Sequence, residues 1–66
     1  MFNAINQITD ETTRRFAEAT YDDYYGNIEQ IPTDEDETDM KTWGITAEQW
    51  HEAVNAARAD LRDDEQ

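Results

Sequence analysis

The chain has 66 residues, with seventeen acidic and five basic side chains and a formal net charge of −12 at pH 7. Such a charge disfavours direct binding to nucleic-acid phosphates and to membranes with anionic lipids, because both repel a negative surface. The length allows one small domain, residues 1–66, and the lack of cysteine excludes disulfides and thiolate metal sites and favours the cytoplasm.

The apolar content is low for a folded chain. Leu, Ile, Val and Phe number nine, about 14% of the residues, below the roughly 20% at which a high net charge predicts disorder. Seven aromatic residues act in the other direction, since each can bury a large area. These features together predict a folded domain of marginal stability, either on its own or with the help of a partner or a second copy.

The N-terminal segment, residues 2–8, has two interpretations. Phe2, Ile5 and Ile8 fit a short helical turn, or an apolar arm that folds back on the core. The first residues lack the basic start and apolar run of a signal peptide, so we expect none. No apolar run reaches the roughly 20 residues that span a bilayer.

A first helix is predicted over residues 10–25. Thr9 or Asp10 can cap its start, and Gly26 is a good stop because glycine tolerates the left-handed conformation. One face of this helix carries mostly apolar and aromatic side chains at helical spacing. They are Phe16, Ala17, Ala19, Thr20, Tyr21, Tyr24 and Tyr25.

Residues 27–44 connect this helix to the next one. Ile28, Ile31 and Trp43 are the expected apolar anchors, and Pro32 marks a break. The stretch 33–39 has no apolar residue and is expected to be a solvated loop. A short helical turn around residues 34–40 is the alternative.

A second helix is predicted over residues 47–62. Thr46 and Gln49 form a capping box, and Ile45 with Trp50 forms a hydrophobic staple. Residues 63–66 are expected to fray. Strand patterns are absent, so the sequence predicts an all-α domain of two main helices, with a short third helix as the alternative noted above. The apolar stripe of this helix comprises Trp50, Ala53, Val54, Ala57 and Leu61.

The central acids fail the calcium-loop template. Asp34, Asp36 and Thr38 match its first, third and fifth positions. Asp39 then stands where glycine is required, and Ile45 stands where a bidentate glutamate is required. We therefore expect no metal site and no cofactor.

Catalytic groups are also lacking. His51 is the only histidine and is expected to be an exposed helical side chain, with no nucleophile beside it. Gly26 and Gly44 are too isolated for a phosphate-binding loop, and no carboxylate pair lies in apolar surroundings. The sequence therefore predicts a protein that is not an enzyme.

The acids are distributed unevenly, which favours a use for them. None occurs in residues 1–9, and eight occur between Asp22 and Asp39. Arginines pair with carboxylates much as they pair with phosphates, so a row of acids can occupy a basic nucleic-acid site. An aromatic side chain would add a central anchor. The predicted partner-binding residues are Asp22, Asp23, Glu29, Asp34, Glu35, Asp36, Glu37 and Asp39, with Tyr24 and Trp43 as aromatic contacts.

Two aspects of this prediction have alternatives. Of the tyrosines Tyr21, Tyr24 and Tyr25, we expect one or two to cover the core and the remainder to be available for contact. The whole chain has two other interpretations: an adaptor that docks the amphipathic helix 47–62 into a partner's groove, or an acidic domain adapted to high salt.

In size, acidity and lack of catalytic groups, the chain resembles small inhibitors of bacterial defence that phages and mobile elements encode. DNA-mimic anti-CRISPR and anti-restriction proteins are the nearest examples. The resemblance concerns overall character and carries over no binding residue. It implies a cytoplasmic, non-enzymatic inhibitor, a monomer or homodimer, that occupies the DNA- or PAM-reading surface of a CRISPR effector or restriction enzyme in a bacterial host.

Overall fold

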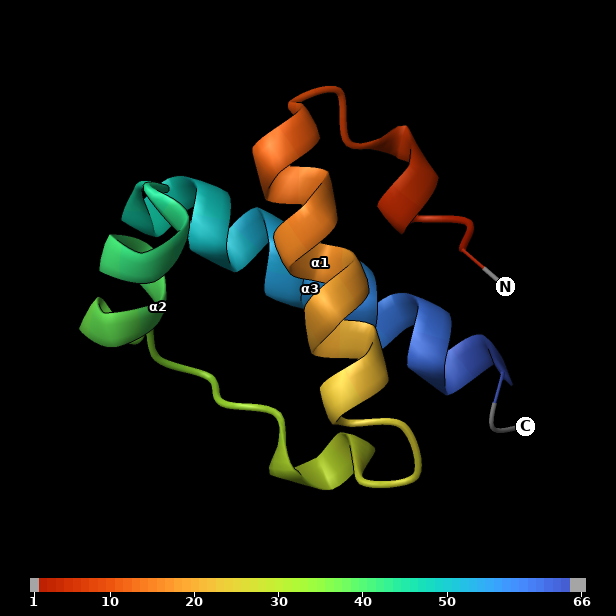
Figure 1. The fold of residues 1–66 in the computed structure, drawn as a ribbon. Helices are drawn as coiled ribbons and strands as arrows, with labels where there is room; N and C mark the ends of the chain where they lie inside the picture. The colour runs from red at the N-terminus through yellow and green to blue at the C-terminus, as the bar shows by residue number, and fades with distance from the viewer. Residues whose placement is uncertain (1, 65–66) are drawn as a thin grey trace.

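Three α-helices and two single-turn 3₁₀ helices make up the fold in this computed structural model, which describes residues 2–64. No strand occurs within that range, so the predicted all-α class is confirmed. Helix α1 lies across α3, and α2 lies beside the first turns of α3 (Figure 1). In chain order the elements are η1 (Ile5–Gln7), α1 (Glu11–Asp23), η2 (Ile28–Gln30), α2 (Glu37–Trp43) and α3 (Ala47–Asp64).

Helix α1 begins where its capping residue predicts. The Asp10 carboxylate accepts hydrogen bonds from the backbone N–H and the hydroxyl of Thr13, at 2.9 and 2.7 Å. These two bonds hold the pKa of Asp10 below its ordinary value. The helix ends at Asp23, two residues before the predicted end, because Tyr24 accepts a turn hydrogen bond from the N–H of Asn27. Gly26 completes that turn with φ of 85°.

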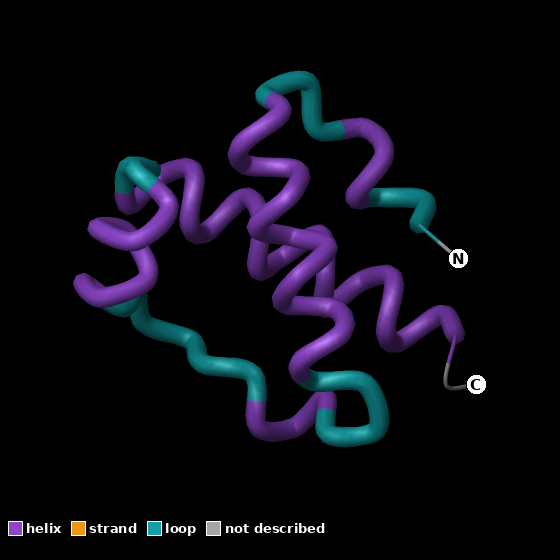
Figure 2. The backbone as a smooth tube through the Cα atoms, in the orientation of Figure 1, coloured by secondary structure: helices purple, strands orange, loops and turns teal. Residues whose placement is uncertain are grey.

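The connection between α1 and α3 contains more structure than predicted. It is mostly loop as far as residue 36, interrupted by the single turn η2 (Figure 2). Residues 37–39, expected to be solvated loop, belong to α2, which is the alternative helical turn shifted by three residues. Asp36 starts this helix by accepting from the N–H groups of Thr38 and Asp39, and Gly44 ends it with φ of 67°.

Helix α3 has the predicted start and a later end. The N–H of Gln49 donates to the Thr46 hydroxyl at 3.1 Å, and the N–H of Thr46 donates to the Gln49 side chain at 2.8 Å, which confirms the capping box. The expected fraying is wrong for Asp63 and Asp64, which remain helical. The Tyr21 hydroxyl donates to the Asp64 carboxylate and ties this last turn to α1. Glu65 and Gln66 lie outside the described residues.

The core forms where α1 and η1 pack on one face of α3. Trp50 is 1% exposed and Leu61 is fully buried, so the predicted stripe of α3 is confirmed as core. Tyr21 covers the edge of this core, with the ring of Phe2 packed edge-on at 5.0 Å. The buried apolar residues are Ile5, Ile8, Phe16, Ala17, Tyr21, Ile31, Ile45, Trp50, Ala53, Val54, Ala56, Ala57 and Leu61. No helix within residues 2–64 is long and apolar enough to cross a membrane.

A buried carboxylate fixes the N-terminal segment. Asp60 is 1% exposed and accepts hydrogen bonds from the backbone N–H groups of Asn3, Ala4 and Ile5, at 3.0, 2.8 and 3.0 Å. The first N–H groups of a helical turn lack partners inside the turn, and Asp60 supplies the acceptor. The segment therefore contains the expected short helical turn, at Ile5–Gln7, and it also folds back on the core, where Ile5 and Ile8 are buried.

Replacing the buried carboxylate tests this arrangement. Asp60→Ala should lower the free energy of unfolding by about 3 kcal/mol, because three N–H groups lose a charged acceptor. Asp63→Ala, an exposed position on the same helix, is the matched control and should leave stability nearly unchanged. Urea unfolding followed by circular dichroism measures both, and equal effects of the two substitutions would contradict the role given to Asp60.

The contact between α1 and the end of α3 predicts an alkaline transition. The hydrogen bond to Asp64, then partial burial and the nearby negative charge, raise the pKa of Tyr21 to about 12. The unfolded pKa is near 10, so this contribution to stability is complete below pH 10 and is lost as the pH rises through about 12. In a titration of tyrosinate absorbance, Tyr21→Phe should remove a step near pH 12. Removal of a step near pH 10 instead would count against the contact.

Candidate acidic interface

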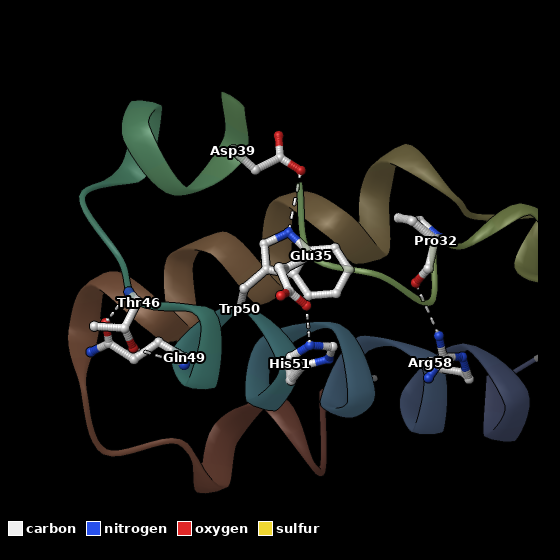
Figure 3. Close-up of polar contacts among 8 residues, drawn as sticks. All are labelled: Pro32, Glu35, Asp39, Thr46, Gln49, Trp50, His51 and Arg58. Atoms are coloured by element: carbon white, nitrogen blue, oxygen red, sulfur yellow. Dashed lines mark hydrogen bonds and ion pairs between the residues drawn. The ribbon is translucent and has the colours of Figure 1, made fainter. Parts of the chain in front are cut away.

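The acidic segment, residues 34–39, and the residues just before it form hydrogen bonds with side chains of α3 (Figure 3). Just before it, the Arg58 guanidinium donates to the carbonyl of Pro32 at 3.3 Å. In its middle, Glu35 Oε2 lies 2.7 Å from His51 Nε2. At its end, the Trp50 indole donates to the Asp39 carboxylate at 3.4 Å. The segment therefore follows one side of α3 instead of extending into solvent.

The five acids of this segment have two different structural roles. Glu35, Asp36 and Asp39 accept hydrogen bonds that position the segment or begin α2. Asp34 and Glu37 are exposed, and within residues 2–64 their carboxylates have no hydrogen-bond or ion-pair partner. The first group holds the backbone, which leaves the second group to present charge outward.

His51 differs from its prediction as a merely exposed side chain. It is 43% exposed and paired with Glu35, which is 44% exposed. Its ring also lies edge-on to Trp50, with centroids 5.0 Å apart. Sequence reasoning missed this pair because sixteen residues separate the partners. The N–H of Glu35 itself, and then His51, hold the pKa of the Glu35 carboxyl below its ordinary value.

Three further predicted acids lie outside the acidic segment. Asp22 and Asp23 end α1, and Glu29 lies on η2; all three are exposed. The last turn of α1 contains no basic residue, so two negative charges lie at the negative end of the helix dipole. Such a placement is electrostatically unfavourable for the helix.

The two predicted aromatic contacts are half-buried. Tyr24 and Trp43 pack against the core, and the rings of Trp43 and Phe16 are 5.5 Å apart. The strongly exposed ring is that of Tyr25, at 60%, which the first-helix pattern had placed on the apolar face. Tyr21 is core, as expected for at least one tyrosine.

A pocket of about 130 Å³ brings four of the ten predicted residues together: Asp23, Tyr24, Asp39 and Trp43. The other six, which do not line it, are Asp22, Glu29, Asp34, Glu35, Asp36 and Glu37. Two acidic stretches that are distant in sequence thus meet at one hollow. The remaining lining residues are Phe16, Ala19, Thr20, Pro32, Trp50 and Val54.

Other kinds of site find little support in this geometry. Among the described residues, no group of three or more histidine or acidic side chains is placed to hold a metal ion. The apolar stripe of α3 is already covered by the chain itself, so it is not free to enter a partner's groove. No known protein family, curated protein or solved structure matches the chain.

The pairing of Glu35 with His51 can be tested by pH titration. Because His51 lowers the pKa of Glu35, His51→Ala should raise that pKa toward 4.5. The pair stabilises the fold above pH 4.5, and its contribution is lost as the pH falls through the lowered pKa of Glu35. Carboxyl carbon NMR shifts report the titration directly. A Glu35 pKa that His51→Ala leaves unchanged would show that the pair does not persist in solution.

Proposed function

We propose that the chain is a non-enzymatic inhibitor that occupies a basic nucleic-acid-binding site on a bacterial protein or complex, such as a CRISPR effector or a restriction enzyme. The observation that carries the proposal is the acidic segment held against α3, in which Asp34 and Glu37 are exposed and Asp39 shares a pocket with Asp23 of α1. The inhibitor would act in the bacterial cytoplasm, as a monomer or homodimer, without binding nucleic acid itself.

The physical case rests on preorganised charge. Duplex DNA carries about one negative charge per 1.7 Å of its axis. A DNA-binding protein neutralises these phosphates with lysine and arginine side chains. Carboxylates pair with these groups, arginine often through two parallel hydrogen bonds. An acidic loop that must be ordered on binding loses part of its affinity to that ordering. Here Glu35 and Asp39 already hold the segment, which reduces the loss.

Attraction between the acids and a basic partner should mainly increase the rate of association. Clustered charge attracts an oppositely charged groove over a distance of about 10 Å at 0.1 M salt, and the attraction weakens as salt is added. A domain whose acids serve only adaptation to high salt would behave differently. It would lose its helical signal in dilute buffer and would displace no DNA.

Competition for DNA tests the proposal. At low salt the protein should displace labelled duplex from at least one CRISPR effector complex or restriction enzyme, and raised salt should weaken the displacement. Failure to displace DNA from any of these complexes at low salt would reject the proposal.

A matched pair of variants separates the position of the charge from its total amount. Asp34→Asn with Glu37→Gln removes two outward charges of the acidic segment and leaves Glu35, Asp36 and Asp39 in place. Glu52→Gln with Asp63→Asn removes two exposed charges on α3. The first pair should slow association with the inhibited complex by about 3-fold or more, and the second should change it less. Equal slowing would mean that net charge alone drives binding.

A further inference from the structure

The pocket of about 130 Å³ lies where α1, α2 and α3 meet, since Asp23, Trp43 and Trp50 line it from the three helices. Its volume is close to the ~150 Å³ of a protein cavity that admits benzene. It is therefore large enough for a small planar group. The pocket opens to solvent, because Asp23 is exposed and Tyr24 and Trp43 are half-buried.

Aromatic rings form much of the pocket wall. Phe16, Tyr24, Trp43 and Trp50 line it, and the rings of Phe16 and Trp43 are tilted by 55° to each other. A cation within about 6 Å of such a ring is attracted to the negative face of its π system, most strongly for tryptophan. Phe16 and Trp50 are buried in the core, whereas Tyr24 and Trp43 are half-buried and offer the ring surface that an occupant can contact.

The charge in the pocket is not balanced by the chain itself. Asp23 and Asp39 contribute two carboxylates, and no Lys, Arg or His lines the pocket among the described residues. Asp39 accepts a 3.4 Å contact from the Trp50 indole. Within residues 2–64 the Asp23 carboxylate has no hydrogen-bond or ion-pair partner. A complementary occupant is therefore a cation from outside the chain.

We infer that this pocket receives the guanidinium group of an arginine side chain from the basic partner, an inference that rests on the proposed function. A guanidinium is planar, weakly hydrated and stacks on aromatic rings, while its fork of N–H groups pairs with carboxylates. A lysine ammonium is compact and strongly hydrated, so it loses more on entering an aromatic pocket. The pocket thus provides the specific contact with one arginine. The exposed Asp34 and Glu37 provide the longer-range electrostatic attraction to the basic partner.

The probe for this inference is Nα-acetyl-L-arginine amide, added to the intact protein. The indole N–H signals of Trp43 and Trp50 should shift in a saturable way in NMR spectra. Nα-acetyl-L-citrulline amide, an uncharged molecule of similar shape, should cause no saturable shift, and the corresponding lysine derivative should bind more weakly. Asp23→Asn should weaken arginine binding about 10-fold. Asp22→Asn, the same change at the neighbouring exposed residue, should leave it within about 2-fold.

Three results would overturn the inference: no saturable shift with arginine, equal binding of citrulline, or tighter binding of lysine. Equal weakening by the two asparagine variants would overturn it as well, because the effect would then reflect total charge. The two proposals fail separately. A protein that displaces DNA but ignores the arginine probe retains its proposed function and lacks this pocket role. A protein that binds the probe and displaces no DNA keeps the pocket and loses the proposed function.

Discussion

The carboxylate of Asp60, a buried residue in the C-terminal part of α3, accepts hydrogen bonds from three backbone N–H groups of the N-terminal segment. Burying a charge costs free energy unless the charge is fully hydrogen-bonded. These bonds therefore stabilise Asp60 in the core, and they also fix the backbone of residues 3–5 against it. The helical turn that results places Ile5 against α3 and leads the chain into α1. A domain with so few large apolar residues buries little hydrophobic area. The hydrogen bonds of Asp60 add to its stability and hold the N-terminal segment in place.

The same principle extends to the acidic segment. Glu35 and Asp39 bind side chains of α3, and Asp36 begins α2, so part of the charge is used to hold the backbone in place. Asp34 and Glu37 of this segment have no such role, and outside it Asp22 and Asp23 stand at the unfavourable end of the α1 dipole. The chain thus combines acids that stabilise it with acids that its own fold does not require. The second group gives the proposal of a basic partner its physical basis.

Local signals predicted much of the fold. The capping box at Thr46 and the stripe from Trp50 to Leu61 are decided within a few residues of sequence, and each is present, whereas α1 ends two residues before the end predicted from Gly26. The errors at His51 and at the end of α3 involve partners distant in sequence. No local pattern predicts that Asp60 is buried, because its partners are the N–H groups of residues 3–5. The acidic residues of the candidate site could be predicted from the sequence, because they are clustered there. The pocket joining Asp23 to Asp39 depends on how the helices pack, which no local pattern encodes.

The acidic segment is an ordered face of the folded domain and not a solvated loop. Backbone NMR order parameters for residues 34–39, measured in dilute buffer, test it most directly. The contacts with Trp50 and His51 predict values near those of the α3 backbone, about 0.85. Values below about 0.6 across the segment would show that it is a mobile loop, and the charges would then have no fixed arrangement to offer a partner.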